Sequence, residues 1–333
     1  MTKLVADELE AGDVSLSRLK LSNQDSFLDQ GILENVFKER NRIDGRAEYT
    51  TGGSYTFVVP AGVKTISALA VGAGGGGAQS WSSSGASGGG LAWYDNIEVE
   101  EGDTIAITVA PQPSPQSNGG TSSVGSYFSA TGGQYNSSSS STVGKPVSGT
   151  VTPNGGNGGW AYGSWQGGGG GAGGYTGNGG NGWYGSSGPN GGSANGSGGA
   201  GGGGGGYGSS TYGFAGGGGV GLRGEDGGGV LGSSVDGSQQ TTPFNSGNSF
   251  YGDFRYSGPG GSGGEHGGPN SNGTATSTVT GRTMYHGEGG FYGGGGAASG
   301  SSQSSNGNFG KGGMGAVVIV YSTNPSFSIG QKH

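Results

Sequence analysis

Hydrophobic residues in this chain gather in short stretches that either alternate with polar residues or run continuously between turn residues. In the N-terminal half these stretches have the length and the β-branched and aromatic content of strands. They predict strands at residues 55–60, 65–71, 91–99 and 104–109, with a further strand within 121–128. We expect the first two to pair around the turn at 61–64, and the next two to pair around the turn at 100–103.

One more apolar stretch, residues 316–321, lies far from the others along the chain. A single strand is not stable without a sheet, and the β unit predicted over residues 49–152 is the obvious partner. We therefore expect residues 314–322 to join that sheet, which brings the two ends of the intervening segment together. Residues 131–152, rich in serine and threonine, are predicted to form a long surface loop, and residues 323–333 a C-terminal tail.

Residues 1–48 differ from the rest and hold 17 of the chain's 35 Asp, Glu, Lys and Arg residues. Residues 14–21 alternate as a short strand does, and residues 26–29 have the pattern of a capping box at a helix start. Apolar residues follow at helical spacing, on a face that is wide for so small a local core. They are Leu28, Ile32, Leu33, Val36 and Phe37. Two interpretations stay open: an attachment or oligomerisation helix, or a helix packed on the chain's own β unit.

Glycine dominates residues 153–313 and accounts for 90 residues of the whole chain. A helix is excluded there, because each glycine costs roughly 1 kcal/mol relative to alanine. An ordinary sheet is weakened by the missing side chains. Two states remain: disorder, or extended polyglycine helices with three residues per turn, whose backbone groups point at neighbouring segments. The repeats at 154–159 and 178–182 place one asparagine in every three residues, which matches the second state, whereas a strict collagen repeat fails.

Such a bundle is close to energetic balance. Ordering the backbone of one residue costs about 1–2 kcal/mol, whereas a hydrogen bond contributes about 0.5–1.5 kcal/mol net. We therefore expect the β unit to act as the nucleus on which the glycine segments order. The predicted fold is mainly β: a small antiparallel β-sandwich closed by the C-terminal strand, an inserted polyglycine II helix bundle over 153–313, and a short N-terminal α/β segment.

Charge and composition exclude several classes of function. The formal charge of −7 gives no basic surface for nucleic acid, and the absence of cysteine excludes disulfides and thiol chemistry. No signal peptide or membrane-spanning run is predicted, so we expect a soluble protein made in a cytoplasm and not inserted into a membrane. His266, His286 and His333 lack the spacing of metal ligands, and no catalytic motif is present. We expect no cofactor, no metal and no enzymatic activity.

Large aromatic side chains interrupt the glycine pattern in clusters. They do not fit between tightly packed glycine helices, so we expect them at turns or on outer faces, among polar residues that suit recognition. The candidate binding residues are Trp160, Tyr162, Trp165, Trp183, Tyr184, Tyr212, Phe250, Tyr251, Phe254, Tyr256, Tyr285 and Tyr292. Three roles stay open: capping the bundle ends, recognition at its tip, and contact between subunits. Isolated charges also occur at Arg223 with Glu225 and Asp226, at Arg255 and at Arg282. We interpret them as solvated loop residues, and the alternative is that one or two of them orient a ligand at a tip.

Several motifs resemble, in sequence and in order, the glycine-rich virion proteins of tailed bacteriophages. The similar segments are YTFVVPAGVKTISALAVGAGGGG at 55–77, GGGLAW at 88–93, GGGGVGL at 216–222 and GGMGAVVIVY at 312–321. The resemblance covers about residues 50–322. Members of this group look like distal tail-fibre adhesins, which carry a polyglycine-helix sandwich and recognise the bacterial surface through loops at its tip. Others are structural proteins of marine cyanophages, and residues 1–48 match no known attachment domain.

The resemblance implies a structural virion protein, foremost a tail-fibre or adhesin component that binds a host surface glycan or outer-membrane protein through its aromatic loops. Residues 1–48 would contact other virion proteins, on the tail or capsid surface, and the chain would form a homo-oligomer, with a trimer as the expected state. Two alternatives stay open. The chain is a capsid decoration or tail-assembly protein without receptor binding, or it is an ice-binding polyglycine protein with flat faces of small residues.

Overall fold

The computed structural model describes the chain from Asp44 onward, with gaps. The described residues are 44–78, 84–136, 143–158, 167–182, 208–209, 213–223, 264–265, 267–268, 274–277, 280–285, 287–298 and 310–323. Within them the secondary structure consists of β-strands and includes no helix, so the fold is mainly β as predicted. The strand predicted at 14–21 and the helix carrying Leu28, Ile32, Leu33, Val36 and Phe37 lie outside the described residues.

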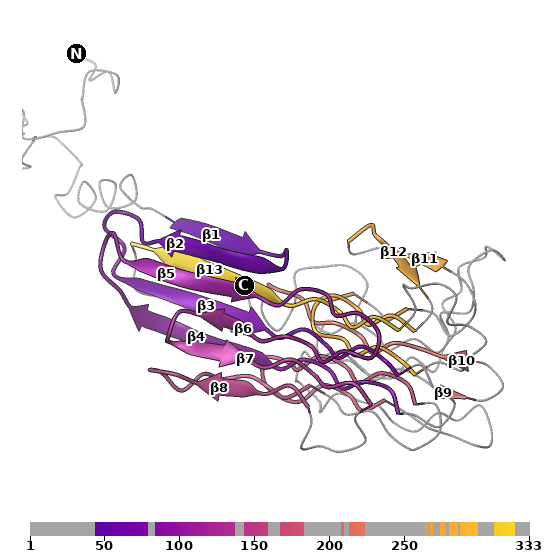
Figure 1. Cartoon of the computed structure of the whole chain (residues 1–333). Helices are drawn as coiled ribbons and strands as arrows, with labels where there is room; N and C mark the ends of the chain where they lie inside the picture. Colours follow the sequence, from indigo (N-terminus) through magenta and orange to yellow (C-terminus); the bar gives the residue numbers. More distant parts are fainter. Residues whose placement is uncertain are drawn as a thin grey trace, which may run out of the picture. The chain divides into compact units, whose positions relative to one another are not determined.

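The first sheet has four antiparallel strands in the order β1-β13-β3-β4. Its strands are β1 (Asp44–Tyr49), β13 (Ala316–Ser322), β3 (Thr65–Val71) and β4 (Leu91–Glu98). β3 and β13 pair over most of their length, from Val71 opposite Ala316 to Ile66 opposite Tyr321. Both strands consist mainly of apolar residues, because both of their faces are buried. The C-terminal strand therefore joins strands from the N-terminal half, as expected (Figure 1).

The second sheet has five antiparallel strands in the order β2-β5-β6-β7-β8. They are β2 (Gly53–Val58), β5 (Thr104–Val109), β6 (Ser122–Val124), β7 (Phe128–Ala130) and β8 (Pro146–Ser148). Buried and exposed side chains alternate along β5, because one face of this sheet is packed and the other faces solvent. Two short antiparallel pairs complete the strands: β9 (Gly208–Ser209) with β10 (Gly213–Phe214), and β11 (Thr274–Thr276) with β12 (Thr283–Tyr285).

One hydrophobic cluster contains inward-facing side chains from both sheets. The first sheet contributes Ile66, Ala68, Ala70, Ala92, Ile97, Val317 and Ile319, and the second contributes Phe57, Ile105, Ile107, Val109, Val124, Phe128 and Ala130. Aromatic rings lie at its margin, where Tyr49 and Tyr55 approach to 5.1 Å between ring centroids. The two sheets therefore share a single core.

The expected pairing of neighbouring strands is wrong. β2 pairs with β5 of the other predicted hairpin, and β3 pairs with β4, so both connections cross from one sheet to the other. The connections bond to each other, since the Val59 amide donates to Asp103 O at 2.9 Å and the Val99 amide donates to Lys64 O at 3.0 Å. The physical reason is that both sides of β3 are already occupied, one by β4 and the other by the distant strand β13.

The structure also changes two boundaries. β1 begins at Asp44, so residues 44–48, assigned by sequence to the N-terminal segment, belong to the first sheet. The surface loop predicted over 131–152 is wrong at Pro146–Ser148, which forms β8 and pairs with β7. Gly133 is buried and is not a surface loop residue either. The Gly133 amide donates to Ala73 O at 2.9 Å, inside the glycine-rich part of the protein.

Candidate functional site

Strands of both sheets continue directly into extended, glycine-rich segments. These segments, together with the other glycine-rich segments that bond to them, are called the glycine region. Residues 72–78 follow β3, 110–120 follow β5 and 131–136 follow β7, while 84–90, 143–145 and 310–315 lead into β4, β8 and β13. Figure 1 shows these segments running side by side away from the strand ends. The end of the glycine region next to the strands is called the sheet end, and the opposite end is called the far end. The region thus begins at residue 72 and not at residue 153.

The amides of residues 72–77 bond to three neighbours in strict rotation. Residues 72, 73 and 74 donate to segments 84–90, 110–120 and 310–315 in that order. Residues 75, 76 and 77 then return to the same three segments in the same order, with N···O distances between 2.6 and 3.1 Å across the six bonds. A strand in a sheet alternates between two neighbours. Residues 72–77 instead have a period of three.

A second segment, residues 169–174, has the same period. Its amides at 169 and 172 donate to segment 213–223, those at 170 and 173 to segment 84–90, and those at 171 and 174 to segment 177–182. The six distances lie between 2.8 and 3.1 Å. Each amide of these two segments therefore has a backbone partner, and both segments are held by main-chain bonds in three directions.

Glycine is required in this arrangement because carbonyl oxygens of neighbouring segments occupy the space of a side chain. A Cβ atom added to Gly74 would stand 1.9 Å from Gly294 O, and one added to Gly169 would stand 1.9 Å from Gly295 O. Cα–H groups therefore face carbonyl oxygens directly, a contact that contributes about 0.5–1 kcal/mol. Alanine is accepted at Ala172, whose methyl group instead packs against apolar side chains.

A second hydrophobic cluster joins the glycine region to the outer face of the first sheet. Its buried members are Leu69, Val71, Leu91, Ala172, Tyr175, Val220, Val318 and Val320. Tyr175 is 1% exposed, and its hydroxyl donates to Gly221 O at 2.8 Å. Trp93 of β4 donates from its indole N–H to Tyr175 O at 2.9 Å. Tyr175 is therefore an anchor of the sheet end, which sequence patterns did not single out.

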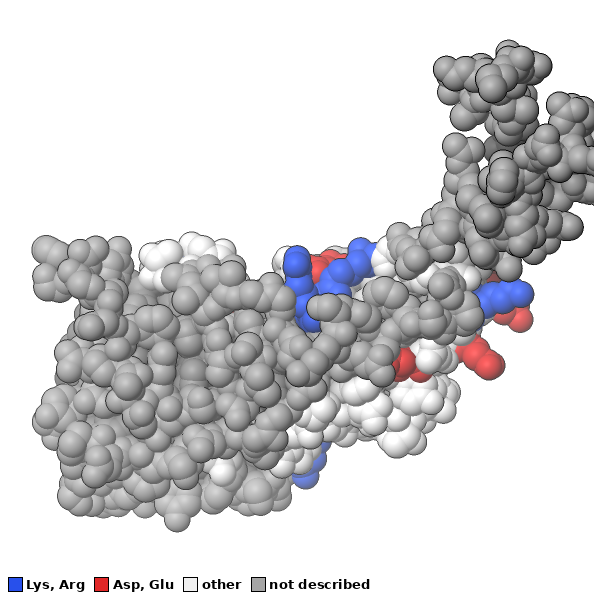
Figure 2. All heavy atoms as spheres, turned by 180° about the vertical axis from the view of Figure 1, so that it is seen from behind, with Lys and Arg blue, Asp and Glu red and all other residues white. Residues whose placement is uncertain are grey.

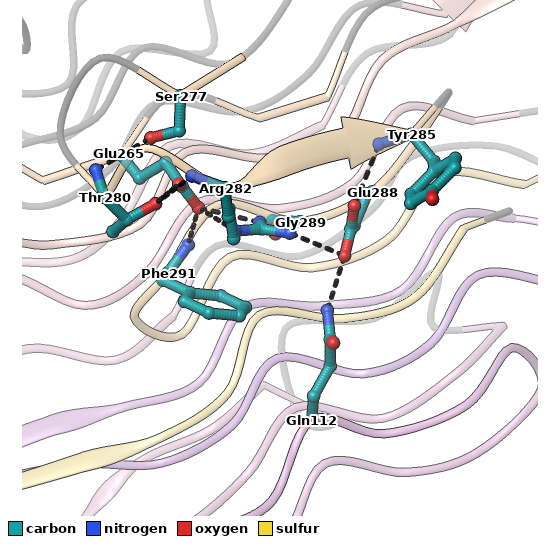
Figure 3. A network of polar contacts seen from close by, with 9 residues as sticks. All are labelled: Gln112, Glu265, Ser277, Thr280, Arg282, Tyr285, Glu288, Gly289 and Phe291. Atoms are coloured by element: carbon teal, nitrogen blue, oxygen red, sulfur yellow. Dashed lines mark hydrogen bonds and ion pairs between the residues drawn. The ribbon is translucent and has the colours of Figure 1, made fainter. Parts of the chain in front are cut away.

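The polar centre of the glycine region is an arginine between two buried carboxylates (Figure 3). Glu265 is 1% exposed and Glu288 is 2% exposed. Arg282 places Nη2 2.7 Å from Glu265 Oε2 and Nη1 2.7 Å from Glu288 Oε1, so one guanidinium spans both. The same guanidinium lies over the Phe291 ring, 3.8 Å from its centroid, in cation–π geometry.

Both carboxylates also accept hydrogen bonds from other residues. Glu265 accepts from the Thr280 hydroxyl and from the Phe291 amide, the latter at 2.8 Å. Glu288 accepts from Gln112 Nε2 at 2.6 Å and from the Tyr285 amide at 2.9 Å. Gln112 lies in the segment after β5, so the cluster ties the β11–β12 pair to a segment that comes from the second sheet. Buried charges of this kind are stable only when paired and hydrogen-bonded in this way.

This cluster corrects one interpretation of the sequence. Arg282 is not a solvated loop residue, because it is the shared partner of two buried carboxylates. Its Nε also donates to Glu265 Oε2, at 2.8 Å. No motif marks these residues, since the three charges are spread over 24 positions from 265 to 288. The one feature of the sequence that could have indicated the cluster is that charged residues are rare in this glycine-rich stretch.

Two of the twelve candidate aromatic residues are described, and they lie at different ends of the glycine region. Tyr285 is the last residue of β12, and its carbonyl oxygen lies beside Gly268. Gly268 in turn accepts a hydrogen bond from the amide of Gly216, which lies near the far end. Tyr292 packs beside the second hydrophobic cluster at the sheet end. The others lie outside the described residues: Trp160, Tyr162, Trp165, Trp183, Tyr184, Tyr212, Phe250, Tyr251, Phe254 and Tyr256.

Burial raises the pKa of the Tyr292 hydroxyl above its ordinary value. A hydrogen bond to Thr50 acts in the opposite direction, and the carboxylate of Glu265 adds to the increase. Burial also raises the pKa of Tyr49, at the margin of the core between the sheets. Because Tyr292 is partly buried against the second hydrophobic cluster, it is a packing residue of the sheet end.

Some described residues are close in sequence to the aromatic clusters, and these described residues lie at identifiable ends of the glycine region. Residues 167–175 run from the far end to Tyr175 at the sheet end, and the Ala298 amide donates to Gly167 O at 3.1 Å. A Cβ on Gly182 would meet Gly168 O, so Gly182 lies at the same level as the start of this segment. Trp165 and Trp183 are close in sequence to these far-end glycines. By contrast, Phe250 to Tyr256 fall between Arg223 and Gly264, which adjoin the sheet end.

Charged groups of the described residues do not form a continuous patch of one sign on the face seen in Figure 2. Lysine and arginine side chains appear there in small separate groups, most of them beside aspartate or glutamate. In the described part of the chain, no three His, Asp or Glu side chains gather as a metal site would require. The same part has no helix that is long and apolar enough to cross a membrane.

Comparison with known proteins does not assign a family: no family model matches the chain, and no curated protein is significantly similar to it.

Proposed function

We propose that the chain is a structural virion protein of a tailed phage, and specifically a tail-fibre or adhesin component that binds the host cell surface. In this proposal the two sheets form a β-sandwich, and the glycine region is a polyglycine II bundle that grows from it. The observation that carries the proposal is the period of three in the hydrogen bonds of residues 72–77 and 169–174. A helix with three residues per turn directs successive amides to three neighbours, about 120° apart.

Rigidity makes such a bundle suitable for presenting a binding surface. Its segments rise about 3.1 Å per residue, and each is bonded to neighbours in three directions, so the bundle resists bending. The side chains available for recognition then belong to the connections at the far end. Trp165 and Trp183 are within two residues in sequence of Gly167 and Gly182, which lie toward that end, and we assign receptor contact to both tryptophans together with Trp160, Tyr162 and Tyr184. Aromatic rings of this kind bind sugars and protein loops with little loss of side-chain entropy.

The proposed partners follow from this arrangement. Residues 1–42 attach the chain to other virion proteins, and the far end contacts a host surface glycan or an outer-membrane protein. Several copies in one particle multiply weak individual contacts by avidity. The proposal includes no catalytic step, no cofactor, no nucleic acid and no membrane insertion.

Adsorption of particles to host cells tests the proposal. Trp165→Ser and Trp183→Ser, introduced together in the phage, should lower adsorption several-fold while particle number and the incorporation of the chain stay unchanged. Tyr175→Phe is the matched control, because Tyr175 is an aromatic residue at the sheet end. Unchanged adsorption of the double variant, with the chain incorporated normally, would favour the alternative of a capsid decoration or tail-assembly protein without a receptor.

Deletion of residues 1–42 tests the proposed attachment to other virion proteins. This deletion should prevent incorporation of the chain into the particle, and it keeps β1, which a deletion of residues 1–48 would remove.

One observation favours the ice-binding alternative. The outer face of the second sheet carries a row of side chains in register, one from each strand: the small hydroxyl residues Ser54, Thr108, Ser123 and Ser129, followed by Val147. Regularly spaced small residues are what an ice-binding face requires. A thermal-hysteresis assay decides between the functions: activity that is abolished by Thr108→Tyr would support ice binding, and no activity in the natural chain would exclude it.

A further inference from the structure

Four strand edges of the two sheets lack a further strand, namely those of β1, β4, β2 and β8. An open edge exposes N–H and C=O groups that pair with another chain, so proteins normally protect such edges. The edge of β4 is covered by a neighbouring segment. Trp93 and Asn154 exchange hydrogen bonds of 2.9 and 2.8 Å, and the Leu91 amide donates to Gly156 O at 3.0 Å.

β1 and β8 are protected by their own residues. Arg46 and Glu48 on β1 form an exposed ion pair, and Arg46 Nη2 also donates to Leu222 O at 2.6 Å. Charged side chains on an edge oppose pairing with another sheet. β8 is three residues long and begins with Pro146, which has no N–H to donate, directly after Lys145.

β2 has none of these protections among the described residues. Its sequence from Gly53 to Val58 contains no charged residue and no proline, and its serine, threonine, tyrosine, phenylalanine and valine favour strands. Ser54 and Thr56 are exposed, and Val58 is 56% exposed, which places it among the exposed large hydrophobic residues. An uncharged edge that favours strand pairing is a template for another strand.

The direction of the backbone groups of β2 follows from its pairing with β5. The Val59 amide donates to Asp103 O, and Val59 O accepts from the Gly102 amide, so both groups of Val59 face the β5 side. Backbone groups of an antiparallel strand alternate between its two sides. Ser54, Thr56 and Val58 therefore direct their N–H and C=O groups to the open edge.

We propose that the open edge of β2 pairs with β2 of a second copy of this chain, antiparallel, around a twofold axis at Thr56. This axis places the three outward-facing residues in register, with Thr56 opposite Thr56 of the second copy and Ser54 opposite Val58. On the inner face Tyr55 then lies opposite Phe57. Threonine–threonine and aromatic–aromatic pairs are among the favourable cross-strand pairs.

Charge supports a second copy as the occupant. Two copies of a chain with a formal charge of −7 repel each other over most contacts. A contact between two β2 strands avoids this repulsion, because β2 contains no charged residue. The acidic turn with Glu100, Glu101 and Asp103 lies at the Val58 end of β2, since Val59 bonds to Asp103. In an antiparallel pair the acidic turns of the two copies lie at opposite ends of the joined strands and do not meet.

The pairing is expected to be weak for separate chains. A six-residue edge buries less than the total of about 1,200–2,000 Å² found in stable complexes. It becomes effective when copies are held close together, because tethering raises their effective concentration. The proposal does not depend on the proposed function, and it predicts a twofold dimer where the sequence resemblance suggested a trimer.

Disulfide trapping in the full chain tests the pairing directly. The chain has no cysteine, so Thr56→Cys introduces a single thiol. Opposed residues of an antiparallel pair have Cα atoms about 4.5–5.5 Å apart, within the range that a disulfide spans. Mild oxidation should convert Thr56→Cys to a covalent dimer. Thr108→Cys, on the same outer face but on the central strand β5, should remain monomeric. Equal dimer formation by both variants, or none by Thr56→Cys at high concentration, would overturn the proposal.

Sedimentation of cysteine-free variants gives a second test. Thr56→Lys places like charges opposite each other and Thr56→Pro removes an outward N–H without removing a bond to β5, so both should lose the concentration-dependent dimer. Thr108→Lys should keep it, and the thermal unfolding of all three should match that of the natural chain. A dimer that persists in Thr56→Lys and Thr56→Pro contradicts the pairing. Binding of β2 only to a different protein, with no self-association, also contradicts it.

Discussion

At the scale of single residues, the atom that faces a Cα decides whether that position of the glycine region must be glycine. Where a carbonyl oxygen faces it, as at Gly74 and Gly169, no side chain fits. Where an apolar pocket faces it, as at Ala172, a methyl group is accepted. Sequence composition indicated close backbone approach in general, but it could not distinguish these positions, since the difference lies in contacts between distant segments.

Gly169→Ala should therefore destabilise the protein by about 1–3 kcal/mol or more, the range for forcing extra atoms into a packed interior. Gly120→Ala is the matched control. There the nearest atom to an added Cβ is the Ala110 methyl group at 3.2 Å, a far looser contact than the 1.9 Å at Gly169, so the loss should stay below about 1 kcal/mol. Chemical denaturation of both variants measures the difference. Equal losses would mean that carbonyl contact does not determine the glycine requirement.

Arg282→Met should destabilise the protein by about 3–5 kcal/mol, because Glu265 and Glu288 would remain buried without their cation. Adding Glu265→Gln and Glu288→Gln to the same chain should recover most of the loss, since neutral amides are less costly to bury. Urea unfolding of the single and triple variants measures both steps. If the triple variant is no more stable than Arg282→Met, the unpaired charges of Glu265 and Glu288 are not the cause of the destabilisation.

Stability should fall at alkaline pH, partly through Tyr292. The raised pKa keeps the native hydroxyl protonated where the unfolded one ionises, so the stabilisation is complete below about pH 10 and is lost as pH rises above it. Tyr292→Phe should make the decline shallower. Phe291→Leu, which changes no titrating group, should leave the slope of the decline unchanged. A slope that Tyr292→Phe does not alter would contradict the buried neutral state.

At the scale of elements, the continuous apolar stretches were recognisable, and β3 and β5 have the bounds that the pattern predicts. Their partners were not predictable, because β13 takes the place beside β3 that a local hairpin would have filled. β1 was missed, since its Gly45, Arg46 and Glu48 interrupt the apolar pattern of an edge strand. Strand formation is thus largely local, whereas sheet order is decided by segments more than 200 residues apart.

Ile319→Ala in β13 should cost about 2–5 kcal/mol, since Ile319 is fully buried in the core shared by the sheets. Because β3 and β13 continue into segments 72–78 and 310–315, amide protection in those segments should fall together with that of the strands. Val58→Ala on the exposed face should change stability by less than about 0.5 kcal/mol. Hydrogen exchange measures both effects, and protection of the glycine segments that is unaffected by Ile319→Ala would show that they order independently.

At the scale of the whole described structure, the sheets and the glycine region are built from the same segments. The period of three was inferred from the asparagine repeats in residues 154–182, yet its clearest run, residues 72–77, lies in a part that the sequence assigned to the β unit. The period of residues 72–77 could not be inferred from the sequence, because the neighbours of this segment include residues 310–315, far away in the chain. The charged cluster around Arg282 was hidden for the same reason.

The account depends most on the rotation of backbone hydrogen bonds among three neighbours. Scalar couplings across hydrogen bonds, measured by NMR on the isotope-labelled protein, identify the acceptor of each amide in residues 169–174. We predict acceptors in three segments, 213–223, 84–90 and 177–182, repeating in that order every third residue. Acceptors that alternate between two segments, or amides that exchange at the rate of an unfolded chain, would contradict the polyglycine bundle and the function built on it.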